Sequence, residues 1–204
     1  MQKLLQQEDV RIQRTRQLLQ QALIDLTVEM GFAPITVRDI TQRAKVNRST
    51  FYRYYLDKYD LLNQYMAAVQ SATSEAALLA EKARPSAPEK VPPGLLVLVK
   101  QVQANAAFYR VMLGRNGDPA FVESVRQMSE NRYRYLFLQY RADSNPTAPP
   151  TDMKLAYISH ASVGALLWWL ENDQPCSAEQ MAIWLGQLSM TSAGLIGVQL
   201  NEHP

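Results

Sequence analysis

Cysteine and histidine are almost absent from this chain of 204 residues, which contains one Cys and two His. The single thiol, Cys176, excludes an internal disulfide framework and is typical of a reducing compartment. With so few nitrogen and sulfur ligands, no His/Cys metal site is expected. The sequence also shows no Gly-rich phosphate loop, Ser-His-Asp set or pair of catalytic carboxylates. We therefore expect no metal, no cofactor and no catalytic residue, so an enzyme is the least favoured class.

Long apolar runs are missing as well. No segment approaches the ~18 consecutive apolar residues that can span a bilayer. The polar N-terminus lacks the apolar region of a secretory signal. Hydrophobic residues nevertheless make up 47% of the chain, so a core can form. These features predict a cytoplasmic protein with no membrane partner.

Helical periodicity dominates what is present, and strand signals are few. Apolar residues recur at steps of three and four before a stop at Gly31 and Pro34, which predicts a first amphipathic helix. The expected buried face of this helix consists of Leu18, Leu19, Ala22, Leu23, Leu26 and Met30. We predict an all-α protein, with Pro-rich connections at 83–94 and 142–150.

Good N-cap residues mark where the other helices should begin. Thr36, with Asp39 three positions later, has the spacing of a capping box, and so has Ser177 with Gln180. Helices are also expected to begin near Asn47, Asp57 and Asp118, to cover 95–113 with one break, and to form a final pair over 151–172 and 177–199.

Positive charge is concentrated in one stretch, although the whole chain carries a net charge of only +2. A local basic patch on a balanced chain is typical of a phosphate-binding surface. A solvated basic helix face would give the same pattern, so charge alone does not decide. Between residues 35 and 58 the acidic residues are Asp39 and Asp57, and the basic ones are Arg38, Arg43, Lys45, Arg48, Arg53 and Lys58.

The same stretch has the layout of a helix-turn-helix, with two short helices around a turn of about three residues. In this motif the second helix enters the major groove of DNA. Arg48 can bind a guanine edge or a phosphate with two donors, and Ser49 and Thr50 are short donors that permit close approach. The Tyr52 hydroxyl can reach a phosphate, whereas Phe51 falls on the core side.

Residues 35–62 read ITVRDITQRAKVNRSTFYRYYLDKYDLL and closely resemble the TetR family of bacterial transcriptional regulators. The resemblance covers about residues 14–65. The positions that carry it are Thr36, Val37, Ile40, Ala44, Val46, Thr50, Phe51, Tyr52, Tyr55, Lys58, Leu61 and Leu62.

Two positions depart from the family pattern. Lys45 stands where the family usually has Gly, so the turn is expected to be strained by about 1 kcal/mol or to gain a phosphate contact. Tyr54 and Tyr55 stand where His-Phe is common, so we assign Tyr55 to the core and Tyr54 to an outward phosphate contact. The predicted DNA-binding residues are Thr36, Lys45, Asn47, Arg48, Ser49, Thr50, Tyr52, Tyr54 and Lys58.

The resemblance implies a helix-turn-helix DNA-binding domain over residues 1–63. A long helix would join it to a helical effector-binding and dimerisation domain over residues 64–204. A two-fold dimer would match a palindromic operator in double-stranded DNA, with recognition helices about 34–36 Å apart. Burial within one subunit is the alternative for the apolar last helices. The interface is assigned to Gly164, Trp168, Trp184, Leu188, Ala193 and Gly197.

A pocket for a small-molecule effector is expected among the helices between residues 95 and 170. Each assigned residue could equally be plain core, and His160 in particular could be a hydrogen-bonded core histidine. The assigned lining is Phe108, Tyr109, Met112, Tyr133, Phe137, Tyr157, His160 and Trp168.

Together these expectations describe a homodimeric, sequence-specific repressor of transcription that acts at the nucleoid and is released by an effector. The alternative is an adaptor or co-activator of the same fold, whose C-terminal domain binds a protein partner.

Overall fold

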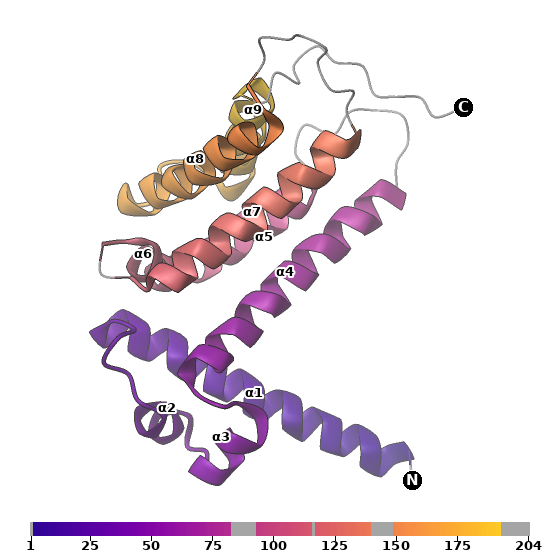
Figure 1. Ribbon diagram of the computed structural model, residues 1–204. Helices are drawn as coiled ribbons and strands as arrows, with labels where there is room; N and C mark the ends of the chain where they lie inside the picture. The colour runs from indigo at the N-terminus through magenta and orange to yellow at the C-terminus, as the bar shows by residue number, and fades with distance from the viewer. Residues whose placement is uncertain (1, 83–92, 116, 140–148, 193–204) are drawn as a thin grey trace.

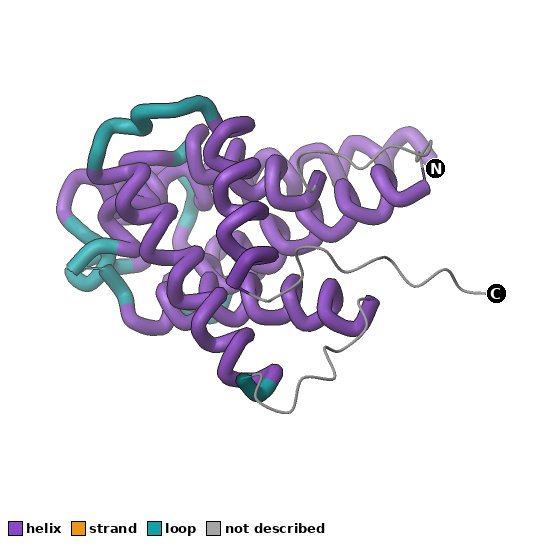
Figure 2. Tube along the Cα trace, turned by 90° about the horizontal axis from the view of Figure 1, so that it is seen from above, coloured by secondary structure: helices purple, strands orange, loops and turns teal. Residues whose placement is uncertain are grey.

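The computed structural model describes residues 2–82, 93–115, 117–139 and 149–192. Helices and short turns make up these ranges, which contain no strand, so the all-α prediction is confirmed (Figures 1 and 2). The helices are α1 (Gln2–Met30), α2 (Val37–Ala44), α3 (Arg48–Tyr54), α4 (Lys58–Lys82), α5 (Pro93–Ala104), α6 (Ala106–Leu113), α7 (Pro119–Gln139), α8 (Thr151–Glu171) and α9 (Ala178–Ser192). The predicted continuation of α9 to Gln199 lies outside the described residues.

The N-terminal unit packs α2 and α3 beneath α1 (Figure 1). Its core combines Leu19 and Leu23 of α1 with Ile40 and Phe51 from the two short helices, all of them buried. Residue Gly31, at a φ of 78°, ends α1 as predicted, and its N–H donates to the Thr27 carbonyl at 3.0 Å. This unit holds the two short helices in fixed orientation to each other.

Two residues of the predicted buried face of α1 are instead exposed. Leu18 is 44% exposed, because one helical step of about 100° moves it off the face that Leu19 and Leu23 bury. Met30 is 49% exposed because it is the last residue of α1, where packing neighbours run out. The sequence pattern was wrong at these two positions.

Side-chain caps fix where the later helices begin. The Asp57 carboxylate accepts from the N–H groups of Tyr59 and Asp60, both at 2.8 Å, and starts α4. Asp118 accepts from the N–H of Phe121 at 3.1 Å and starts α7. These caps and the break between α5 and α6 at Asn105 confirm the predicted boundaries. No described helix is long and apolar enough to cross a membrane.

The long helix α4 leaves the N-terminal unit and packs along α5 (Figure 1). Helix α7 packs on α8, α8 on α6 and α9, and α9 on α5, which closes the C-terminal bundle. Phe108 of α6 stands edge-to-face with Tyr65 of α4 and Phe121 of α7, at centroid distances of 5.9 and 5.6 Å. This aromatic cluster joins α4 to the bundle.

Candidate DNA-binding surface

A capping box fixes the start of α2, as the sequence predicted. The Asp39 N–H donates to the Thr36 hydroxyl oxygen at 3.3 Å, and the Thr36 N–H donates to the Asp39 carboxylate at 2.9 Å. The Thr36 hydroxyl also donates to that carboxylate at 2.6 Å, which holds the pKa of Asp39 below its usual value. Thr36 remains exposed at the helix start, beside the free N–H groups that attract a phosphate.

The turn between α2 and α3 is made by Lys45 in the left-handed region, at φ 53° and ψ 42°. Its N–H donates to the Gln42 carbonyl at 3.2 Å, and the Val46 N–H donates to the Thr41 carbonyl at 3.0 Å. The positive φ expected from the family's Gly is thus adopted by a lysine, whose Cβ makes this conformation costly. The Lys45 side chain is exposed next to α3.

Helix α3 presents a polar face to solvent at its N-terminal end. Arg48, Ser49 and Tyr52 are exposed, Thr50 is half-buried, and Phe51 points into the core with no exposed surface. The Arg48 guanidinium donates to the Tyr52 hydroxyl at 3.1 Å and lies 5.5 Å from the centre of its ring. These two side chains therefore form one platform on the exposed face.

Asn47 is the N-cap residue of α3, but its side chain makes no capping hydrogen bond. It is exposed, so its amide is available for another partner such as a phosphate or a base edge.

The two tyrosines that end α3 are both turned toward the protein. Tyr55 is buried, and its hydroxyl has no hydrogen-bond partner among the described residues; burial raises its pKa. Tyr54 is half-buried against the core, and the Arg16 guanidinium lies 5.5 Å from its ring centre. The core assignment of Tyr55 is confirmed by its burial. The ring of Tyr54 is only half-buried, so its outward phosphate contact stays a prediction.

Lys58 occupies the first position of α4 and is half-buried. Its ammonium donates to the carbonyl oxygens of Phe32 and Ala33 at 3.0 and 2.7 Å, and lies 4.7 Å from the Phe32 ring centre. Burial lowers its pKa. The predicted phosphate contact of Lys58 therefore competes with a structural role that the sequence pattern did not indicate.

Arg43 belongs to the basic stretch but does not contribute free charge. Its guanidinium donates two hydrogen bonds to the Glu29 carboxylate, at 2.7 and 2.5 Å, and joins α2 to α1. The two residues of this ion pair are 14 positions apart in sequence, so no local sequence pattern predicts the contact. The other exposed basic residues of this stretch are Arg38, Lys45, Arg48 and Arg53.

Two family descriptions match this chain. Residues 19–65 match the bacterial regulatory proteins of the tetR family, and residues 89–191 match a transcriptional regulator C-terminal region of TetR type. The second match alone covers half of the chain. The chain belongs to the TetR family of bacterial transcriptional regulators. Members of this family bind DNA through a helix-turn-helix.

Known proteins similar to this TetR-family chain agree in fold. A TetR transcriptional regulator from Streptococcus agalactiae 2603V has 24% identity, covers 89% of this chain and 97% of its own, and gives a TM-score of 0.62. NalD, the secondary repressor of the MexAB-OprM multidrug efflux pump in Pseudomonas aeruginosa, has 17% identity, coverage of 95% and 100%, and a TM-score of 0.54.

A sequence relative is the HTH-type transcriptional regulator YxbF of Bacillus subtilis (strain 168), which is 24% identical over 177 residues. The match covers 86% of this chain but only 44% of YxbF, so the chain spans less than half the length of this curated relative.

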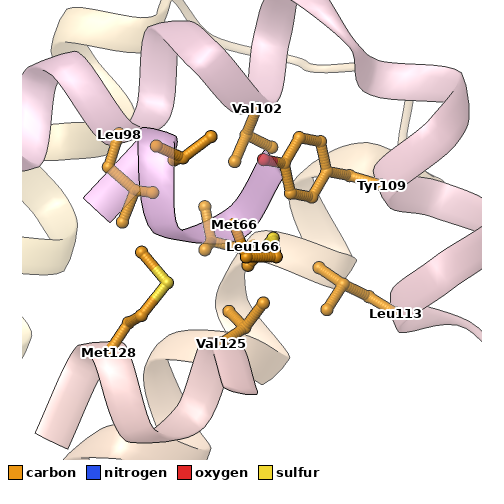
Figure 3. Close-up of a pocket in the computed structure, with 9 residues that line it drawn as sticks. Met66, Leu98, Val102, Tyr109, Leu113, Val125, Met128 and Leu166 are labelled. Atoms are coloured by element: carbon orange, nitrogen blue, oxygen red, sulfur yellow. The ribbon is translucent and has the colours of Figure 1, made fainter. Parts of the chain in front are cut away.

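The C-terminal domain of this TetR-family chain contains a small apolar cavity of about 20 Å³ (Figure 3). Of the predicted effector-pocket residues that the structure describes, only Tyr109 lines it, while Phe108 and Met112 are buried core. The Tyr109 hydroxyl lies 3.5 Å from that of Tyr65, and burial raises its pKa well above the usual value. The lining residues are Met66, Val69, Leu98, Val102, Tyr109, Leu113, Val125, Met128 and Leu166.

The other predicted pocket residues lie elsewhere. Tyr157, His160 and Trp168 are exposed, so the pocket prediction is wrong for them: the inner face of α8 is one helical step away, at residues such as Leu166 and Trp169. The His160 Nδ1 is 2.7 Å from the Ala156 carbonyl oxygen of its own helix, so it is not a core histidine.

Tyr133 is buried on another side of α7, where its hydroxyl donates to the Ser189 hydroxyl oxygen at 2.6 Å. The side chain of Phe137 lies outside the described residues. Among the described residues no three His, Cys, Asp or Glu side chains gather into a possible metal site.

The outer faces of α8 and α9 carry large apolar side chains in solvent. Trp168 is 49% exposed, Trp184 41% and Leu188 63%, and Gly164 lies on the same face of α8 with open space at its Cβ position. Tyr157 and Met153 extend this surface along α8, both about two-thirds exposed. We call this the α8–α9 surface. Ala193 and Gly197, which were assigned to the same interface, lie outside the described residues.

Proposed function

We propose that this TetR-family regulator is a homodimeric repressor that binds a palindromic operator and leaves it when an effector binds. The N-terminal 63 residues form the DNA-binding domain, and residues 64–204 bind the effector and the second subunit. The observation that carries the proposal is the exposed face of α3, where Arg48, Ser49 and Tyr52 stand beside the tight turn at Lys45.

The chemistry of this face suits a major groove. Arg48 can donate two hydrogen bonds to a guanine, and the Tyr52 hydroxyl can donate to a phosphate while it accepts from Arg48. Thr36 and Asn47, at the starts of α2 and α3, would bind neighbouring phosphates. Because these contacts release counterions, affinity should fall steeply as salt rises.

The α8–α9 surface supports the homodimer. Large apolar side chains exposed on two helices that contact each other are typical of an interaction site. Two tryptophans with flanking leucine and glycine provide large apolar area and close helix approach, which suits a second copy of the same surface. A two-fold dimer built there would present two α3 helices to the two halves of a palindrome.

The small apolar cavity is the place where we expect the effector to bind. Its volume of about 20 Å³ has room for little more than a water molecule, whereas small-molecule pockets occupy about 300–1,000 Å³. An effector must therefore move the helices that line the cavity. Met66 and Val69 belong to α4, whose first residue, Lys58, is hydrogen-bonded to the DNA-binding domain. A displacement of α4 would therefore be felt first at the connection between α1 and α2, which leads into the helix-turn-helix.

DNA binding can be tested with DNA from upstream of the chain's own gene. We expect Tyr52→Phe to weaken binding to all sequences and Arg48→Ala also to reduce the preference for the operator, by about 1–3 kcal/mol at the contacted base. Lys100→Ala, a surface change on α5, serves as the matched control. Unchanged binding in both α3 variants would refute the proposed interface. Expression of a reporter gene behind the operator distinguishes a repressor from an activator. A protein partner captured in a pull-down, together with operator binding that no small molecule changes, would favour the adaptor.

A further inference from the structure

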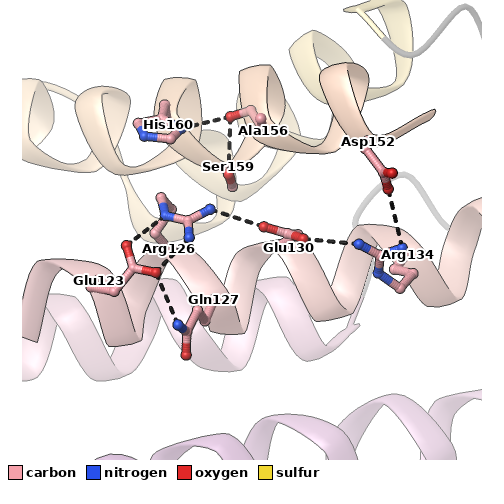
Figure 4. A network of polar contacts seen from close by, with 9 residues as sticks. All are labelled: Glu123, Arg126, Gln127, Glu130, Arg134, Asp152, Ala156, Ser159 and His160. Atoms are coloured by element: carbon pink, nitrogen blue, oxygen red, sulfur yellow. Dashed lines mark hydrogen bonds and ion pairs between the residues drawn. The ribbon is translucent and has the colours of Figure 1, made fainter. Parts of the chain in front are cut away.

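Helix α7 carries three arginines, and two of them are neutralised on one side of the helix. The Arg126 guanidinium pairs with Glu123 and with Glu130, and Arg134 pairs with Glu130 at 2.9 Å and with Asp152 of α8 at 3.5 Å (Figure 4). The hydrogen bond from Arg126 lowers the pKa of Glu123 to about 2, so this network is charged at any physiological pH.

Arg132 lies on the opposite side of α7. At about 100° per residue it continues the row formed by Phe121, Val125 and Met128, four positions beyond the last of them. Val125 and Met128 both line the small apolar cavity, and Phe121 is buried. Arg132 therefore projects from the inner face of α7, one helical turn beyond the cavity wall.

No described residue pairs with Arg132. Within the described ranges, neither a hydrogen bond nor an ion pair joins its guanidinium to a side chain or carbonyl. The other two arginines of α7 pair with three carboxylates in total. The side chain is half-buried, and burial lowers its pKa. A half-buried cation with no partner among the described residues costs solvation, and a methionine or leucine at this position would avoid that cost.

We propose that the effector is an apolar molecule with a single carboxylate, which pairs with the Arg132 guanidinium while the apolar part expands the cavity. This inference rests on the proposed release by an effector and names the chemistry of that effector. The cavity wall is made of Met, Val and Leu side chains with one Tyr, which suits a hydrocarbon or aromatic body. The guanidinium fork fits a carboxylate with two parallel hydrogen bonds.

The expected discrimination follows from the charge of the head group. A hydrogen bond to a charged partner contributes about 1.5–3 kcal/mol, so an acid should bind roughly ten to a hundred times more tightly than its uncharged amide. Arg132→Gln removes the charge and keeps a hydrogen-bonding side chain of similar reach. The acid should then lose its advantage, while the affinity of the amide stays the same.

The test is calorimetric titration of the full-length protein with octanoate, octanamide, phenylacetate and phenylacetamide. At least one acid should bind wild type about tenfold or more tighter than its amide, and Arg132→Gln should abolish that preference. Arg134→Gln, which removes a paired arginine from the other side of α7, should preserve it. Equal binding of acids and amides, a preference that survives Arg132→Gln, or no binding of any probe would overturn the inference.

A second measurement needs no ligand. If Arg132 is held unpaired for an effector, Arg132→Met should raise the melting temperature of the free protein. A lower melting temperature would show that the guanidinium has a structural partner, and would overturn the inference. Operator binding by the same protein is measured separately, by gel shift. If the wild-type protein binds the operator but shows no preference for an acid, only this inference fails, whereas failure to bind any DNA defeats the proposed function.

Discussion

The Lys58 ammonium donates a hydrogen bond of 2.7 Å to the carbonyl oxygen of Ala33 and so joins the first turn of α4 to the connection between α1 and α2. The neighbouring Phe32 carbonyl accepts from the same nitrogen at 3.0 Å. One side chain therefore ties the start of the long helix to the connection between α1 and α2. A lysine expected to bind phosphate is also part of the frame that positions α3.

Replacing Lys58 by Met should destabilise the protein as well as weaken DNA binding. The apolar stem would still cover Phe32, but two carbonyl oxygens would lose their donor, at a cost of about 1–3 kcal/mol. Urea unfolding of the variant measures this loss. Weaker DNA binding with unchanged stability would instead show that the ammonium serves the phosphate alone.

Two substitutions of Lys45 distinguish the effect of backbone strain from the effect of the side-chain charge. Lys45→Gly should stabilise the protein by up to about 1 kcal/mol, because Gly adopts a φ of 53° without a Cβ penalty. Lys45→Ala keeps the strain and removes only the charge, so its stability should match wild type while its affinity for DNA falls if Lys45 binds a phosphate. Thermal unfolding and gel shifts on the two variants distinguish these effects. A destabilised Gly variant would contradict the strained turn.

Tyr55→Phe should leave the protein as stable as wild type or more stable. The Tyr55 hydroxyl is buried and has no hydrogen-bond partner among the described residues, so its removal costs no contact and relieves a desolvated polar group. Tyr65→Phe is the matched control. The Tyr65 hydroxyl accepts a hydrogen bond from the Gln101 amide at 3.1 Å, so its removal should lower the stability of the protein. A marked loss of stability in Tyr55→Phe would indicate a partner for this hydroxyl.

Leu188→Asp should convert the dimer to a monomer, because it places a charge on the α8–α9 surface. Leu56→Asp changes an even more exposed leucine outside that surface and should leave the dimer intact. Sedimentation velocity gives the oligomeric state of each variant. A Leu188→Asp protein that remains a dimer would place the interface elsewhere.

The helices of the DNA-binding domain could be predicted from the sequence because the residues that begin and end them are close together in the chain. A capping box at Thr36, a cap at Asp57 and a turn at Lys45 each depend on residues within five positions, and all were found where the pattern placed them. The contacts that pattern could not reveal join distant segments. Arg43 with Glu29 and Lys58 with Ala33 are 14 and 25 positions apart, and both take a cation away from the expected DNA-binding face.

The C-terminal bundle was less predictable for a related reason. Helix α8 is apolar around most of its circumference, so composition could not tell its inner face from its outer one. Trp168 and Trp169 are adjacent, yet one is half exposed and the other completely buried. Only the packing of α6, α7 and α9 around α8 decides which of them faces the core. Because of that packing, Tyr157 and Trp168 lie at the surface and not in the predicted pocket.

The most direct test of the account is a fluorescence-anisotropy titration of the full-length protein with DNA from upstream of its own gene and with a scrambled sequence, at several salt concentrations. We predict two chains per operator, a clear preference for the operator over the scrambled DNA, and an affinity that falls linearly on a log–log plot as salt rises. Arg48→Ala should reduce the preference. Equal, weak binding to both DNAs, unaffected by Arg48→Ala, would contradict the assignment of α3 as the helix that reads DNA.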